Sequence, residues 1–116
     1  MEQKTIAEIR RLITPPAGIE DVLTAFLLLL DYPPDDVNGW NKCQTIMSRS
    51  GDKSVMTKVS RFDPLYCSPK KAQKSADMIA PYTLEIIRNK NLHAAKIYEW
   101  TKSMIEQVKV SGGLQI

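Results

Sequence analysis

Two adjacent prolines, Pro15 and Pro16, constrain the fold of this 116-residue chain more than any other feature. A residue that precedes a proline is pushed out of the α-helical region, so a helix near the N-terminus must end by Thr14. Proline at the first helical position costs nothing, because the amide donor that it lacks would have no partner there. The pair therefore predicts a corner between two helices, with Thr14 capping the second.

The segment after the prolines has the composition of a central, buried helix. Glu20 and Asp21 fall in its first turn, where the positive end of the helix dipole favours acidic groups. Its apolar residues form a wide face that extends around the helix: Ile19, Val22, Leu23, Phe26, Leu27, Leu28, Leu29 and Leu30. A helix over residues 17–30 is therefore predicted to be the spine of the core.

Breakers and capping residues divide the rest of the chain into further helices, and no segment shows the alternation of a strand. The predicted helices cover residues 3–12, 17–30, 40–47, about 52–61, 69–80 and 84–108. Expected caps of the last four are Asn38, Ser50 or Asp52, Ser68 and Thr83. The sequence predicts an all-α fold, a bundle of about six helices in a single domain over residues 1–116.

Composition limits the classes of protein to consider. The first 36 residues hold three basic and seven acidic groups, and the remainder holds thirteen basic and six acidic groups. The longest apolar run, residues 25–30, is far shorter than the roughly 20 residues that cross a bilayer, and no signal peptide is evident. We therefore expect a soluble, intracellular protein without a membrane partner. Cys43 and Cys67 are expected to be reduced, buried thiols.

Motifs for catalysis and for nucleic-acid binding are missing from the sequence. There is no glycine-rich phosphate loop, and His93 is the only histidine. An enzyme would have only Asp63, His93 and Glu99 as acid-base groups, without a readable nucleophile. Aromatic stacking groups and a recognition-helix pattern are also absent. The sequence therefore predicts no catalytic residue, cofactor or metal site, and no nucleic-acid partner.

Basic residues gather towards the C-terminal part of the chain. They are Arg88, Lys90 and Lys96, with Asn89 among them, and Lys70, Lys71 and Lys74. Two interpretations are open, an ordinary solvated face or a surface that binds an acidic partner.

Three segments, in this order, resemble the stalk tip of dynein heavy chains, which is their microtubule-binding domain. IAEIRRLITPPAGIEDVLTAFLLLL resembles the point where the first strand of the stalk coiled coil reaches a proline pair. Trp40 in GWNKCQTIM and then Phe62-Asp63 follow as in that family. LEIIRNKNLHAAKIYEWTKSMIEQ is similar to the long final helix of the domain. The resemblance covers about residues 5–108.

The resemblance implies a division of the chain and a function. Residues 3–13 would end the first coil strand, residues 15–100 would form a helical head, and residues 101–110 would begin the returning strand. Sliding between the strands would alter the binding helices, with Pro15 and Pro16 as the hinge. The residues that it implies for tubulin contact are Lys53, Lys58, Arg88, Asn89, Lys90 and Lys96. It further implies a monomeric, non-enzymatic fragment of a cytoplasmic or ciliary motor bound to the cytoskeleton.

The sequence departs from the family at three places. Glu20 and Asp21 stand where the family commonly has a lysine or another tubulin-facing residue, and acids there would repel acidic tubulin. The loop after Pro81 is shorter, and little coil lies before the prolines or in the C-terminal SGGLQI. These departures keep open an alternative function, a non-catalytic helical adaptor of dynein-stalk ancestry that binds another protein.

Overall fold

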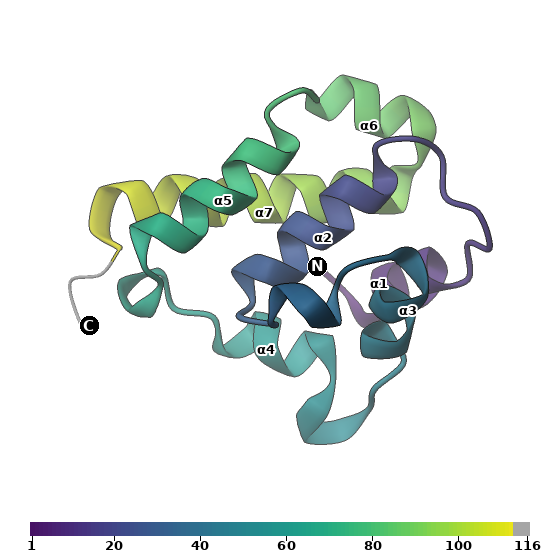
Figure 1. Cartoon of the computed structure of the whole chain (residues 1–116), viewed down its shortest axis with the longest axis horizontal. Helices are drawn as coiled ribbons and strands as arrows, with labels where there is room; N and C mark the ends of the chain where they lie inside the picture. Colours follow the sequence, from purple (N-terminus) through teal and green to yellow (C-terminus); the bar gives the residue numbers. More distant parts are fainter. Residues whose placement is uncertain (113–116) are drawn as a thin grey trace.

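The computed structural model describes residues 1–112, and every regular element in that range is helical (Figure 1). The α-helices are α1 (Gln3–Arg10), α2 (Ile19–Leu29), α3 (Trp40–Met47), α4 (Val55–Arg61), α5 (Pro69–Ile79), α6 (Leu84–Lys90) and α7 (Leu92–Ser111). Short 3-10 turns lie in three of the connections: η1 (Pro34–Asp36), η2 (Gly51–Lys53) and η3 (Pro64–Tyr66). The prediction of an all-α fold is confirmed.

Helix α2 lies at the centre of the molecule, as the apolar pattern predicts. It contacts α3, α5 and α7, and its most extensive contact is with α5. Figure 1 shows α2 and α5 in front of the long α7. The radius of gyration of the Cα atoms is 13.2 Å, close to the ~13 Å typical of a compact chain of 100 residues.

Aromatic and small side chains hold the three central helices together. Phe26 of α2 is fully buried and meets Trp100 of α7 edge-on, with ring centroids 5.5 Å apart. Trp100 also meets Phe62 edge-on, with ring centroids 5.5 Å apart. The buried Ser75 hydroxyl of α5 donates to the Ala25 carbonyl of α2 at 2.9 Å. This bond requires close approach of α2 and α5, which their small residues permit.

Helix α1 packs against α7 and α3. Its buried face consists of Thr5, Ile6 and Ile9, while Ile13, which follows the helix, is 91% exposed. Figure 1 shows α1 and α7 with opposite chain directions. Helix α7 also contacts η3. The fit is tight at Gly112, the residue after α7, where an added Cβ atom would lie 3.0 Å from the Cys67 carbonyl oxygen. The sequence also predicts that SGG at residues 111–113 ends this helix, and residue 113 lies outside the part of the chain that the structure describes.

The predicted long helix over residues 84–108 is wrong in one respect, because the chain breaks at Asn91. This residue is extended, with φ −166° and ψ 124°, and ends α6. Its side-chain oxygen accepts hydrogen bonds from the amides of His93 at 2.8 Å and Ala94 at 3.0 Å, and so caps α7. Residues 1–112 therefore contain seven α-helices, where the sequence indicated about six.

The start of α2 also differs from the prediction. Thr14 does not cap it; the helix begins at Ile19, and Gly18 occupies the capping position with φ 94°. A left-handed backbone of this kind favours glycine. A Cβ atom on Gly18 would moreover lie 2.8 Å from the Tyr82 ring. Pro15 and Pro16 therefore precede α2, and are not part of its first turn.

Two of the four other predicted caps are correct. Ser68 accepts from the Lys71 amide at 3.2 Å, and Thr83 accepts from the Ile86 amide at 3.2 Å. Asn38 does not cap α3, because Gly39 occupies that position without a side-chain bond. Ser54, and not Ser50 or Asp52, caps α4. Several neighbouring polar residues could cap the same helix. The sequence therefore predicts the approximate position of the helix end better than the identity of the capping residue.

Candidate binding surface

Residues 84–96 comprise α6, the break at Asn91 and the start of α7, and we call this region the α6–α7 corner. The predicted binding residues Arg88, Asn89, Lys90 and Lys96 are all exposed there. Two apolar side chains are exposed among them, Ile86 at 42% and Leu92 at 65%. A surface that combines accessible cations with accessible apolar groups can attract an acidic protein and then exclude water from the contact.

The cations of the α6–α7 corner differ in what surrounds them. Arg88 lies 3.7 Å from Glu99 of α7, in an exposed ion pair. Such pairs contribute little to stability, so Arg88 can exchange this partner for another carboxylate at low cost. Within residues 1–112, Lys90 and Lys96 have no ion-pair partner. Both are therefore available to an acidic surface.

Lys53 and Lys58 belong to a second group, which we call the α4 edge and which also includes Arg49. The Lys58 ammonium lies 4.1 Å from the centroid of the Tyr32 ring, and the Arg49 guanidinium lies 5.9 Å from it. Tyr32 is buried, and burial raises the pKa of its hydroxyl. Lys58 is half-buried and already engaged with this ring, whereas Lys53 in η2 is exposed.

The structure does not bring these two groups together. Figure 1 shows α4 at the lower side of the molecule and α6 at its upper side. The predicted set therefore falls into four residues at the α6–α7 corner and two at the α4 edge.

The two acids at the start of α2 have different surroundings. Tyr82 donates a hydrogen bond from its hydroxyl to Asp21 Oδ2 at 2.7 Å, which raises the pKa of Tyr82 because the bond requires the protonated phenol. The Tyr82 carbonyl in turn accepts from the Tyr98 hydroxyl at 3.0 Å. Asp21 thus links α2 to the segment before α6. Glu20 is exposed and has no such partner within residues 1–112.

The chain that leads into the prolines is held by α3, which the sequence did not indicate. Trp40 Nε1 donates to the Leu12 carbonyl at 2.7 Å. Gln44 Nε2 donates to the carbonyls of Arg10 at 2.8 Å and Leu12 at 2.9 Å. A helix that ends before prolines leaves carbonyls without amide partners, so a donor was needed here. No local signal shows that it comes from a residue more than 30 positions away.

The residues considered for acid-base chemistry have other roles. Asp63 accepts from the Leu65 amide at 3.0 Å and caps η3, and Glu99 pairs with Arg88. The His93 Nδ1 atom is buried without a hydrogen-bond partner. Burial also raises the pKa of both thiols, Cys43 and Cys67, which lowers their reactivity at neutral pH.

Within residues 1–112, no group of three or more His, Cys, Asp or Glu side chains is placed to hold a metal ion. No helix in this part of the chain has the length and apolar character needed to cross a membrane.

Comparison with known proteins confirms the resemblance to dynein heavy chains. The chain is 28% identical over 114 residues to "Dynein alpha chain, flagellar outer arm" from Chlamydomonas reinhardtii, a match that covers 93% of this chain. It is 29% identical over 114 residues to "Cytoplasmic dynein 2 heavy chain 1" from the same organism, which covers 95% of this chain. The homologues are thus heavy chains of both a flagellar and a cytoplasmic dynein.

The matched region is a small part of these relatives, since the chain spans 2% of the length of each. No protein-family model matches the chain. No solved structure matches it either.

Proposed function

We propose that this chain is the microtubule-binding tip of a dynein-type stalk. In this proposal it binds the acidic surface of tubulin through the α6–α7 corner, and it performs no catalysis itself. The observation that carries the proposal is the exposure of Arg88, Lys90 and Lys96 beside Leu92, on a helical chain that is similar to dynein heavy chains over most of its length.

The packing of α1 supports a mechanical role for the prolines. Helix α1 contacts α7, and the chain between α1 and α2 is held by Trp40 and Gln44. Displacement of α1 along α7 would therefore pull on α3 and on the start of α2. We propose that residues 3–13 and 101–110 are the ends of two coil strands and that Pro15 and Pro16 form the hinge between coil and head.

The α4 edge is the second part of the proposed contact. Lys53 is exposed and can reach an acidic partner directly. Lys58 would have to leave the Tyr32 ring to do so, which lowers its net contribution. We therefore assign most of the tubulin affinity to the α6–α7 corner, in a monomer located on cytoplasmic or axonemal microtubules.

Cosedimentation with microtubules at low and high ionic strength tests the proposal. Contacts between exposed charges are screened by salt, so binding should fall steeply as salt rises. Lys90→Glu should weaken binding by about tenfold, equivalent to roughly 1.4 kcal/mol. Lys109→Glu is the matched control, because Lys109 is exposed near the other end of α7. Equal binding by both variants, or no binding at low salt, would contradict the proposal.

One observation favours a second candidate, an adaptor that binds a protein other than tubulin. Glu20 is exposed at the start of α2, where a carboxylate would face an acidic partner unfavourably. An adaptor would fail to sediment with microtubules at low salt but would recover a different partner from an extract. Sedimentation therefore separates the two candidates.

A further inference from the structure

A groove between α5 and the segment that follows α2 is lined by none of the cations assigned to tubulin, although it shares Tyr32 with the α4 edge. Its volume is about 760 Å³, within the range of ligand-binding clefts. Leu28, Tyr32, Pro34 and Met78 give it an apolar lining. No residue of the α6–α7 corner lines it.

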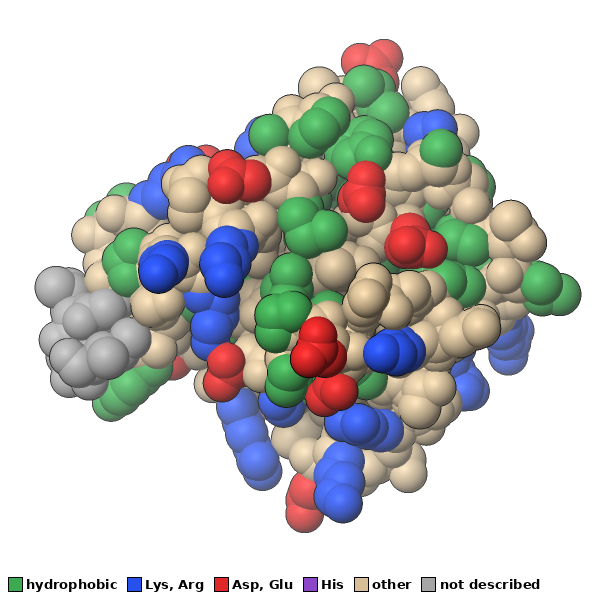
Figure 2. Space-filling view, in the orientation of Figure 1, with side chains coloured by type: hydrophobic (Ala, Val, Ile, Leu, Met, Phe, Trp, Pro, Cys, Tyr) green, Lys and Arg blue, Asp and Glu red, His purple; other side chains and the backbone are tan. Residues whose placement is uncertain are grey.

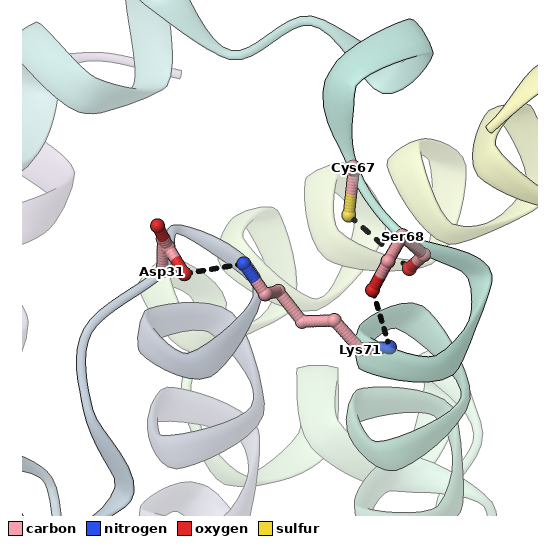
Figure 3. A network of polar contacts seen from close by, with 4 residues as sticks. All are labelled: Asp31, Cys67, Ser68 and Lys71. Atoms are coloured by element: carbon pink, nitrogen blue, oxygen red, sulfur yellow. Dashed lines mark hydrogen bonds and ion pairs between the residues drawn. The ribbon is translucent and has the colours of Figure 1, made fainter. Parts of the chain in front are cut away.

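Lysines of α5 form one wall of this groove. Lys70, Lys71 and Lys74 all line it. Lys71 is held by Asp31, and its amide donates to Ser68 beside Cys67 (Figure 3). Lys70 and Lys74 are exposed and have no ion-pair partner within residues 1–112. Asp77, the other acid of the groove, accepts from the Gln73 side chain at 2.7 Å. Two unpaired ammonium groups are therefore available on this wall.

An acidic cleft continues from the groove. It has a volume of about 380 Å³ and is lined by Glu20, Asp21 and Asp35. The cleft and the groove share Leu28, Pro34 and Met78, so the apolar lining runs from one into the other. Figure 2 shows a band of hydrophobic side chains down the middle of this face, with basic side chains over the start of α5 and acidic side chains on the other side of the band.

We propose that the groove and the cleft together bind a peptide segment of a partner protein, acidic at one end, basic at the other and apolar between. Its acidic end would meet Lys70 and Lys74, its apolar residues would cover Leu28 and Met78, and its basic end would meet Glu20 and Asp35. Charge complementarity at both ends fixes the direction of the segment, and the apolar lining supplies the gain from removing water. The lysine wall of this surface lies outside the proposed tubulin contact, whereas Glu20 at its acidic end stands where the family commonly has a tubulin-facing residue.

Fluorescence anisotropy with three synthetic peptides of about 12 residues tests the proposal. A peptide of this length is about 18 Å long as a helix. The first has glutamates at one end, lysines at the other and leucines on one helical face. The second contains the same residues scrambled, and the third replaces every glutamate by lysine. We expect the first to bind at least tenfold more tightly than the others. Equal affinity of all three, or no binding, would overturn the proposal.

Variants of the chain locate the binding. Lys70→Glu with Lys74→Glu should weaken binding of the first peptide by at least tenfold. An acid at position 70, in the first turn of α5, is favoured by the helix dipole, and Lys74 is exposed, so this variant should fold. The control, Lys4→Glu with Lys109→Glu, changes two exposed lysines that line neither hollow and should bind within twofold of the original chain. If both variants bound the first peptide equally weakly, the net charge of the chain alone would account for binding, and the proposal would be overturned.

Two further readouts complete the test. Amide shifts in the NMR spectrum should change in α5 and in residues 31–37 when the first peptide is added; changes confined to the α6–α7 corner would contradict the assignment. If inorganic phosphate alone at millimolar concentration displaced the first peptide completely, the groove would be a site for small anions. That result would overturn the proposal. Microtubule sedimentation of Lys70→Glu with Lys74→Glu should be unchanged, so the groove and the tubulin contact can fail separately.

Discussion

The α6–α7 corner and the α4 edge both present cations, but the two groups differ in which of their cations are already engaged within the molecule. Lys90 and Lys96 are exposed and unpaired within residues 1–112, whereas Lys58 is half-buried against the Tyr32 ring. A cation that already has an aromatic partner must give up that contact before it binds another group. Similar residues in a sequence can therefore serve stability in one place and recognition in another.

The α4 edge is attached to the core less firmly than the central helix α2, and substitution of the two phenylalanines that contact Trp100, Phe26 of α2 and Phe62 at the end of α4, tests this. Phe26→Ala should lower the free energy of unfolding by about 3–5 kcal/mol, since Phe26 is fully buried on α2 and α7 loses its central contact. Phe62→Ala should cost about 1–2 kcal/mol, because Phe62 is only partly buried. Urea unfolding followed by circular dichroism measures both. Equal losses would show that α4 is as central to the fold as α2.

The α6–α7 corner depends on the cap at Asn91, so its removal should have the next largest effect. Asn91→Ala should lower the free energy of unfolding by about 1 kcal/mol, because the amides of His93 and Ala94 lose their acceptor. Asn91→Asp keeps an acceptor and should be nearly neutral. Hydrogen exchange at these two amides should accelerate in the alanine variant only. Unchanged exchange would mean that the break between α6 and α7 does not depend on this side chain.

Removal of single lysines compares the two cation groups directly. Lys58→Ala should lower the free energy of unfolding by about 0.5–1 kcal/mol through loss of the contact with Tyr32. Lys90→Ala should change it by less than about 0.5 kcal/mol, because Lys90 has no internal partner. Thermal unfolding of the two variants checks the difference. A loss for Lys90→Ala as large as that for Lys58→Ala would remove the distinction.

The smallest expected effect concerns the exposed acid at the start of α2. Glu20→Lys should raise microtubule affinity at low salt by about threefold, roughly 0.6 kcal/mol, if this end of α2 lies near tubulin. The same change should lower the free energy of unfolding by about 0.3–1 kcal/mol, because a cation is unfavourable at a helix N-terminus. Glu20→Gln should give an intermediate affinity. A decrease in microtubule affinity for Glu20→Lys would contradict the placement of this end of α2 near tubulin.

The helices and their buried faces could be predicted because they depend on local periodicity. The apolar face of α2 and the caps of α5 and α6 are properties of short segments, and all are found in the structure. The break at Asn91 was missed because the apolar spacing of residues 84–108 continues through it. A single asparagine that ends one helix and caps the next leaves that spacing unchanged.

The candidate surface was only partly predictable, for a similar reason. Clustering in the sequence is enough to group Arg88, Lys90 and Lys96, which lie at the end of α6 and the start of α7 and are all exposed. It does not show that Lys58 lies over Tyr32, or that Gln44 holds the end of α1, because both contacts join distant segments. The groove between α5 and the segment after α2 likewise exists only once these elements have packed. Spacing along the chain carries no information about such contacts.

Electron cryomicroscopy of microtubules decorated with this chain at low salt tests the central claim most directly. The account predicts ordered density in which the α6–α7 corner, around Lys90 and Lys96, faces tubulin, and in which the groove beside α5 faces solvent. Bound density that turns the α6–α7 corner away from the microtubule, or bare microtubules at saturating protein, would contradict it.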